Sequence, residues 1–239
     1  MKKAINLILD IAIFLTILNI IYQFYISKTS YNQIDITSNS KTIYGQNMDY
    51  VKYYQEYYRN QDIIGILELQ NNGFITLVPQ TNNNSYYLNH LVNHQKSKLG
   101  STFLDYRNNI NSSQKLIIYG HNSFNNKTPF NKLINLLDYK YYLLHPFLKF
   151  TTKFYQNTYQ IFSVYTTKSD YTHTKLNFID SKDYLNHIYQ LKEKSTYNID
   201  VNLTNSPIIV LQTCLDKKNI LVVSAIKTGG EDEKNNFTF

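Results

Sequence analysis

Cysteine is almost absent from this chain of 239 residues, which contains only Cys214. A single cysteine excludes an internal disulfide and any cysteine-based zinc or iron–sulfur site. Glycine and proline are also scarce, at 7 and 4 residues, which excludes collagen-like sequence and low-complexity disorder. The thiol is therefore either an inert buried group or a reactive one, and its surroundings must decide between them.

Arginine is nearly as scarce, since Arg59 and Arg107 are the only two, although the formal charge is +7. The positive charge comes from lysine, and AT-rich coding produces the same excess, so it is poor evidence for nucleic acid. No block of like charges and no nucleic-acid-binding motif is present. HExxH, GxGxxG and P-loop motifs are also missing. We therefore expect no nucleic-acid partner, no metal and no cofactor.

One long apolar run occupies Ala4–Ile26 and follows Lys2 and Lys3. In a helix, at about 1.5 Å per residue, this run is long enough to cross a hydrocarbon core. The basic flank and the lack of a cleavage site predict an uncleaved signal anchor over residues 1–27. Asp10 weakens this interpretation, and an amphipathic helix is the alternative. The prediction is a single-pass protein of the cell membrane whose remaining chain is extracellular.

The remaining chain divides into a polar linker at 28–46, a domain at 47–228 and a polar tail at 229–239. Apolar, β-branched runs between turn residues predict strands. These runs are Ile63–Leu69, Phe74–Val78, Lys115–Tyr119, Tyr159–Tyr165, Ile208–Gln212 and Ile220–Ile226. Helical spacing predicts helices at Asn47–Asn60, Pro129–Leu137 and Ser181–Lys194, the last with Ser181 as its N-cap. Regular βαβ units are not evident, so a mixed or closed sheet is expected.

Cys214 lies at the end of an apolar run, just before a loop that contains Lys217 and Lys218. A thiol at a strand end is held rigidly yet meets solvent, as a nucleophile requires. A buried structural cysteine is the alternative. His121 follows another strand and Gly120, so a sheet can bring it to the thiol, and imidazole transfers protons near neutral pH. The other histidines are expected to be surface or packing residues: His90, His94, His145, His173 and His187.

Several short motifs occur in one order between residues 47 and 228. They are Asp62-Ile-Ile-Gly65, Asn84–His90, Gly100–Asn108 with its DYRN sequence, Ile118-Tyr-Gly-His-Asn122, Tyr159–Tyr165 and Leu211-Gln-Thr-Cys214. Each is short, but their combination, order and spacing resemble a class B sortase. The predicted helix at 181–194 matches a helix that class B enzymes carry before the cysteine strand.

The resemblance implies a mainly β fold: a closed eight-stranded β-barrel with peripheral helices, on the outer face of a Gram-positive membrane. It implies a cysteine transpeptidase in which Cys214 attacks the threonine carbonyl of a C-terminal sorting signal. An amine from a cell-wall precursor or a pilin lysine then resolves the thioacyl-enzyme. His121 is expected to act as general acid and then as general base. The implied partners are therefore secreted proteins with a sorting signal and the amine acceptor.

The resemblance also implies substrate contacts at the groove, in the loop after Tyr165 and beside the nucleophile. The residues concerned are Asn84, Leu88, Thr167, Tyr171 and Gln212. The family's arginine after the cysteine is missing, and Asn219 or Ile220 takes its place, with Lys217 and Lys218 nearby. Losing an oxyanion donor costs about 10²–10³ in rate. The alternatives are a catalytically impaired sortase fold that binds surface proteins as a scaffold, and a hydrolytic cysteine peptidase.

Overall fold

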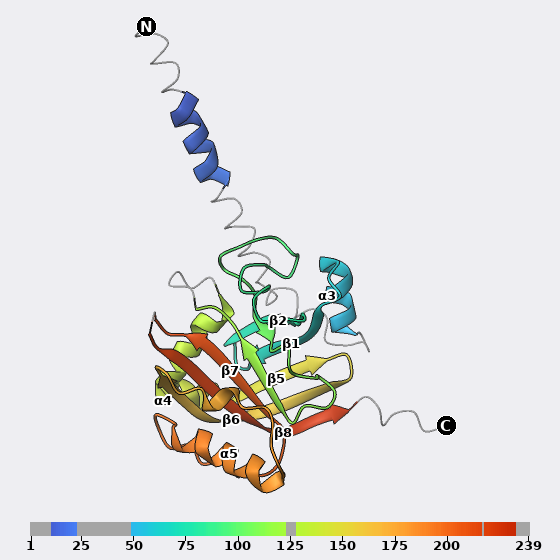
Figure 1. Ribbon diagram of the computed structural model, residues 1–239, viewed down its shortest axis with the longest axis vertical. Coiled ribbons are helices and arrows are strands. Elements are labelled where there is room, and N and C mark those ends of the chain that lie inside the picture. Colours follow the sequence, from blue (N-terminus) through green and yellow to red (C-terminus); the bar gives the residue numbers. More distant parts are fainter. Residues whose placement is uncertain (1–10, 23–48, 123–127, 217, 233–239) are drawn as a thin grey trace, which may run out of the picture.

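The computed structural model describes residues 11–22, 49–122, 128–216 and 218–232 (Figure 1). In chain order its elements, with η marking 3₁₀ helices, are α3 (Tyr50–Tyr58), β1 (Ile63–Leu69), β2 (Phe74–Pro79), β3 (Phe103–Leu104), β4 (Lys115–Tyr119), η1 (Pro129–Leu137), α4 (Tyr139–Leu144), β5 (Phe147–Thr152), β6 (Tyr155–Thr167), η2 (Thr172–Thr174), α5 (Ser181–Glu193), β7 (Ile208–Cys214) and β8 (Ile220–Asp232). The predicted linker at 28–46 lies outside the described residues.

The strands form one eight-stranded sheet in the order β2-β1-β5-β6-β8-β7-β4-β3. The β4–β7 pair is parallel, and the other ladders of the described sheet are antiparallel. The two outermost strands approach each other through side chains: the hydroxyls of Thr76 and Thr102 lie 2.8 Å apart, and Thr102 donates to the Leu77 carbonyl at 2.7 Å. The sheet is thus a nearly closed barrel, which confirms the predicted fold class.

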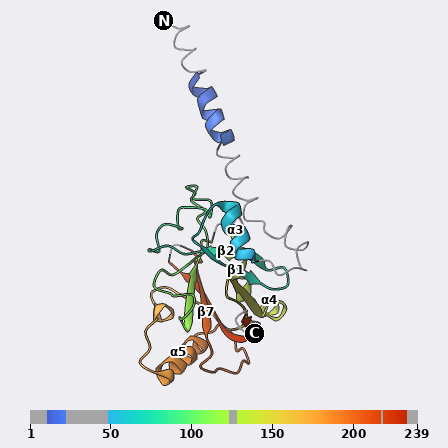
Figure 2. The ribbon, with the colours of Figure 1, turned by 90° about the vertical axis from the view of Figure 1, so that its right-hand side faces the viewer.

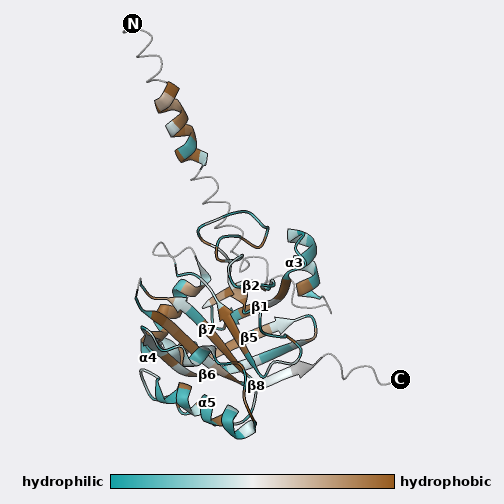
Figure 3. Ribbon diagram, viewed as in Figure 1, coloured by the Kyte–Doolittle hydropathy of each residue, from teal (hydrophilic) through white to brown (hydrophobic). Residues whose placement is uncertain are grey.

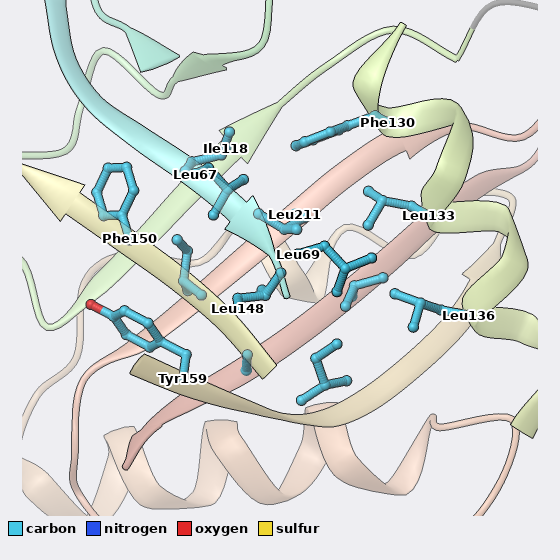
Figure 4. Close-up of a cluster of buried hydrophobic side chains, with 14 of the residues drawn as sticks. Leu67, Leu69, Ile118, Phe130, Leu133, Leu136, Leu148, Phe150, Tyr159 and Leu211 are labelled. Atoms are coloured by element: carbon cyan, nitrogen blue, oxygen red, sulfur yellow. The ribbon is translucent and has the colours of Figure 1, made fainter. Parts of the chain in front are cut away.

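Alternation along the strands separates two groups of buried side chains. The inner core fills the barrel and includes Leu67, Leu148, Phe150 and Leu211, with Phe130, Leu133 and Leu136 added by η1 (Figure 4). The outer core lies on the other face of the sheet. It comprises Ile117, Phe162, Tyr165, Tyr184, Ile188, Leu191, Leu203, Ile208, Val210, Val222 and Ile226. Residues of β7 therefore point inward and outward in turn, as expected of a strand covered on both faces.

Helix α5 covers the outer core and joins β6 to β7, as the resemblance implied. Its apolar side chains face the sheet, while the rest of the helix is hydrophilic (Figure 3). The predicted N-cap is wrong by one residue: the Asp180 carboxylate, not Ser181, accepts from the backbone N–H of Asp183 at 2.8 Å. Helix α3 packs Val51 against Ile63 and Leu77, on the opposite side of the molecule from α5 (Figure 2).

The boundaries depart from the predictions where the apolar pattern is weak. Strand β5 and the helix α4 were not predicted, and the segment Pro129–Leu137 is a 3₁₀ helix. Strand β8 continues to Asp232 and pairs with β6, so the segment expected as a tail starts inside the sheet. Residues 233–239 lie outside the described part of the chain.

The structure contradicts the predicted location as a single-pass protein of the cell membrane. Within the described residues, no helix is both long and apolar enough to cross a bilayer. Of the expected span, residues 11–22 are described, and they form an exposed helix. The rest of the expected span, residues 4–10 and 23–26, lies outside the described residues.

A buried lysine lies between the sheet and α5. Lys115 Nζ donates to the Lys175 carbonyl at 2.8 Å and lies 2.8 Å from His187 Nε2. Burial, with the nearby charges of Arg107 and Lys175, holds the pKa of Lys115 well below its usual value. Burial, with Lys115 and Lys175 close by, lowers the pKa of His187 from 6.5 to about 3. Burial therefore disfavours the charged form of both groups.

The His187 environment predicts acid destabilisation. Because the pKa is lower in the folded state, the unfolded chain binds more protons between pH 6.5 and about 3. The free energy of unfolding should fall as the pH falls through this range, by up to about 1.4 kcal/mol per pH unit. His187→Gln should flatten the profile in urea titrations at pH 4–7.5, whereas His94→Gln, at an exposed histidine, should not. An unchanged slope in His187→Gln contradicts this prediction.

Candidate active site

The parallel pairing of β4 with β7 brings His121 and Cys214 to one end of the sheet. Tyr119 pairs with Gln212, and the N–H of Gly120 donates to the Gln212 carbonyl at 3.1 Å. Cys214 is the last residue of β7, and His121 lies two residues past Tyr119, the last residue of β4. Neighbouring strands lie about 4.8 Å apart, so the register brings the ends of the two strands together although Cys214 and His121 are distant in sequence.

The two side chains also belong to the same face of the sheet. Ile117 on β4 and Val210 on β7 are members of the outer core. Side chains alternate along a strand, so Tyr119 and His121 follow Ile117 on this face, and Gln212 and Cys214 follow Val210. Cys214 is exposed and His121 is half-buried. The thiol is therefore accessible to a substrate, and the alternation assigns the imidazole to the same face of the sheet.

On the other side of Cys214 lies Ile220, its antiparallel partner on β8. Ile220 pairs in turn with Thr167, the last residue of β6. Directly paired residues point to one face. The strand ends thus form a row across β6, β8, β7 and β4: Thr167, Ile220, Cys214 and His121. Of the two positions expected to replace the family's arginine, Ile220 is the one that faces the thiol.

Asn219, the other position, is hydrogen-bonded to Asp216 within the β7–β8 turn. Its amide donates to Asp216 Oδ2 at 2.6 Å, and its backbone N–H donates to Asp216 Oδ1 at 2.8 Å. Lys218 is exposed, and its backbone N–H donates to the same carboxylate at 2.7 Å. These bonds close the β7–β8 turn on itself. Lys217 lies outside the described residues.

Neither arginine of the chain reaches the position opposite the thiol. Arg59 is the exposed C-cap of α3, in the left-handed conformation, and α3 packs on β1 and β2. Arg107 makes a two-pronged ion pair with Asp105, at 2.9 and 2.7 Å, and Asp105 also accepts from the Tyr119 hydroxyl at 2.8 Å. Although burial opposes ionisation, the Arg107 and Tyr119 bonds hold the pKa of Asp105 below its usual value. The DYRN motif therefore braces the end of β4.

A backbone carbonyl orients the imidazole of His121. Its Nε2 lies 2.8 Å from the Leu88 carbonyl oxygen. A carbonyl oxygen only accepts, so Nε2 carries a proton and donates it. In the neutral ring the lone pair then resides on Nδ1, which is the nitrogen left to exchange a proton with the thiol and the substrate.

Gly100 allows the loop that contains Leu88 to approach His121. Its φ is +58°, and an added Cβ would lie 2.6 Å from the Tyr87 carbonyl oxygen, 2.7 Å from that of Leu88 and 2.9 Å from His121 Cδ2. Two of these neighbours are backbone atoms, which cannot rotate away. Glycine is therefore required both by the backbone conformation and by the space available.

Gly100→Ala should destabilise the fold by about 1–3 kcal/mol and disturb the His121–Leu88 bond. The midpoint of urea unfolding and the ¹⁵N shifts of the His121 ring measure the two effects. Gly229→Ala is the matched control, because an added Cβ at Gly229 meets nothing within 4 Å and its φ is not positive. Equal stability of the two variants would show that the close approach is not needed.

The predicted substrate residues fall into two groups. Thr167 and Gln212 lie on the same face as Cys214, and Leu88 contacts His121 through its carbonyl. Tyr171 is 60% exposed in the loop after β6. Asn84 is anchored by its side chain, whose Oδ1 accepts from the Tyr106 N–H at 2.9 Å. The structure therefore places Thr167 and Gln212 on the face that carries Cys214 and joins Leu88 to His121.

His173 was expected to be a surface or packing residue, but it contacts the candidate site. It is completely buried, and its Nε2 lies 2.7 Å from Gln212 Oε1. The contact joins the 3₁₀ turn η2 to β7, which are distant in sequence. Nothing in the sequence around Thr172–Thr174 indicates this pairing.

Comparisons with known proteins agree with the fold and the motifs. No protein-family model matches the chain. Sortase B of Staphylococcus aureus is 33% identical over 174 residues, which cover 70% of this chain and 71% of that protein. A crystal structure of sortase B complexed with triglycine superposes with a TM-score of 0.72 at 25% identity, covering 89% of this chain and 98% of that one. A Staphylococcus aureus sortase B–substrate complex gives a TM-score of 0.68 at 27% identity, covering 84% and 92%. The sequence identity over most of both proteins and the shared barrel together show that the chain belongs to the class B sortases.

Proposed function

We propose that this class B sortase is an active transpeptidase with Cys214 as nucleophile and His121 as acid–base catalyst. The observation that carries the proposal is the register of β4 and β7, which supports a direct pairing of the two side chains on one face. The family itself is one of sortase-type cysteine transpeptidases. Competence of this particular chain depends on those two residues acting as a unit.

In the first half-reaction the Cys214 thiolate attacks the carbonyl carbon of the threonine in a sorting signal. The C–N bond to the next residue breaks, and the protonated imidazole of His121 gives its proton to the departing amine nitrogen. The product is a thioacyl-enzyme. Nδ1 of His121 is the nitrogen assigned to this transfer, because Nε2 donates to the Leu88 carbonyl.

In the second half-reaction an amine attacks the thioester carbon. His121 takes the proton of that amine, the C–S bond breaks, and the thiolate is restored. A complex of sortase B with triglycine and one with a substrate exist among the relatives, which supports a peptide signal and a terminal amine as the two reactants. A cell-wall precursor and a pilin lysine are the two acceptor classes that the proposal includes.

The row of strand ends supports a substrate path across the outer face. A peptide carbonyl at Cys214 would lie between Ile220 and His121, with Thr167 and Gln212 close to the same row. Ile220 offers no hydrogen bond to the developing oxyanion. The proposed enzyme is therefore slower than one with a donor at this position, by about 10²–10³ unless another group supplies it.

Intact-protein mass spectrometry tests the proposal. The full chain is incubated with a peptide library in which threonine precedes a variable residue, and then with triglycine or an Nα-blocked lysine. We expect a mass increase that maps to Cys214, its release by amine, and a peptide–amine product. Protein alkylated with iodoacetamide is the matched control and should show neither.

Two results would overturn the proposal. If no peptide forms an adduct, the alternative is a catalytically impaired sortase fold that acts as a scaffold. Ile220 opposite the thiol is the observation that supports this alternative. Release by water with no transfer to either amine would identify a hydrolytic peptidase.

A further inference from the structure

His173 makes a side-chain contact that packing alone would not require. It is completely buried in η2, yet its Nε2 lies 2.7 Å from the side chain of Gln212. Gln212 precedes Cys214 by two positions on β7 and shares its face of the sheet. A buried imidazole therefore contacts the side chain that is the nearest neighbour of the thiol along its own strand.

The protonation of the pair follows from the contact. Burial, with the nearby charges of Lys115 and Lys194, outweighs the Gln212 hydrogen bond and Asp170, so the pKa of His173 lies below its ordinary value and the ring is neutral. With Nε2–H donating to Gln212 Oε1, the atom left without a partner among the described residues is Nδ1, as an acceptor. The reverse arrangement would bury an unpaired N–H, which is the costlier defect.

This bond determines where the other end of the amide points. Oε1 and Nε2 of Gln212 diverge from one carbon, so holding Oε1 on the buried ring directs Nε2 away from it. Gln212 is half-buried, and no hydrogen bond among the described residues uses its Nε2. A donor is thus presented at the exposed end of β7, on the face that carries the thiol.

The loop that carries His173 is itself fixed at both ends. Asp170 accepts from the backbone N–H of Thr172 at 2.8 Å and from the ammonium group of Lys194 at the C-terminal end of α5. The Thr174 carbonyl lies 3.5 Å from Arg107 Nη2, which belongs to the braced DYRN motif. The imidazole therefore has a defined position relative to β7.

We propose that His173 is a positioning residue that fixes the Gln212 amide so that its Nε2 donates to the substrate carbonyl oxygen at Cys214. The proposal rests on the proposed function, because it supplies the hydrogen bond that Ile220 cannot make. Negative charge develops on that oxygen as the C–S bond forms, and a donor held in place before the reaction stabilises it.

A double-mutant cycle tests the coupling. Gln212→Met keeps the length but removes the amide, and His173→Phe keeps a buried ring but cannot donate. Each should lower the single-turnover rate of acylation by about 10-fold or more, with little change in KM for the peptide. The double variant should be no slower than Gln212→Met, because His173 acts only through the amide. His173→Gln, whose amide reaches the Nε2 position, should restore much of the rate.

NMR on the full chain supplies a readout that does not need turnover. We expect the ¹⁵N shifts of His173 to show the Nε2–H form from pH 6 to 8, and a distinct Gln212 amide signal that collapses to the free value in His173→Phe. An Nδ1–H form, or an unchanged Gln212 amide in His173→Phe, would overturn the proposal.

The outcomes separate the two proposals. Additive losses in the cycle, or full activity of Gln212→Met, would reject the positioning role while the Cys214 adduct still supports the transpeptidase. If no adduct forms with any peptide, the transpeptidase proposal fails, and the NMR result alone decides whether His173 fixes the amide.

Discussion

Replacing His121 with glutamine is expected to lower the acylation rate by about 10²–10⁴, the contribution of a positioned acid–base group. A glutamine amide can occupy the Nε2 position and still donate to the Leu88 carbonyl, so the loop should stay in place. What disappears is the proton on Nδ1 that the leaving amine requires. Single-turnover mass spectrometry of the Cys214 adduct measures the change.

His121→Ala supplies the complementary experiment. It should lose activity to a similar extent but regain part of it when imidazole is added, because the space vacated by the ring admits a free base. His121→Gln should not be rescued, since its side chain fills that space. If both variants acylate at the wild-type rate, His121 has no role in proton transfer and the assigned mechanism is wrong.

Restoring arginine opposite the thiol should raise activity. Ile220→Arg places a guanidinium on the same face as its partner Cys214, and its aliphatic stem can cover the outer core where Ile220 packs now. The planar group offers several donors to the oxyanion, so we expect acylation to accelerate by about 10²–10³. The rate of adduct formation is again the measurement.

Two controls make this gain interpretable. Ile220→Met retains an apolar side chain and should not accelerate the reaction, and Ile220→Lys adds charge without the planar geometry and should gain less. In the Ile220→Arg background, the loss caused by Gln212→Met should shrink, because the arginine then supplies the donor. A slower Ile220→Arg enzyme with unchanged stability would mean that this position does not face the oxyanion.

The parts of the fold that were predicted correctly are those with strong local signals. The strand at Ile63–Leu69 and the helix starting at Ser181 have clear apolar patterns bounded by turn residues. Strand β5 was missed because its sequence, FLKFTT, has no continuous apolar run: a lysine interrupts it and two threonines end it. The predicted location in the membrane was wrong, since the described residues contain no helix long and apolar enough to cross a bilayer.

In the candidate site, the positions of single residues were predictable, but contacts between residues distant in sequence were not. Cys214 and His121 each end an apolar run, so both positions were predictable as strand ends. Their pairing depends on the β4–β7 register, which no local pattern encodes. The sequence left open whether Asn219 or Ile220 replaces the family's arginine, and the ladder partner of Cys214 identified Ile220 as the residue that faces the thiol. His173 had no signal, because its contact with Gln212 joins a short 3₁₀ turn to a distant strand.

The parallel β4–β7 ladder also has a consequence for how the protein is made. Its two strands are far apart in sequence, and contacts of that kind form late because a large loop must close first. β4 and β7 are neighbours only after β5, β6 and α5 have taken their places between them along the chain. During synthesis the proposed nucleophile, Cys214, is therefore translated after the proposed base, His121, and the strands that carry them meet only in the assembled barrel. The proposed catalytic pair is thereby incomplete until the barrel has folded.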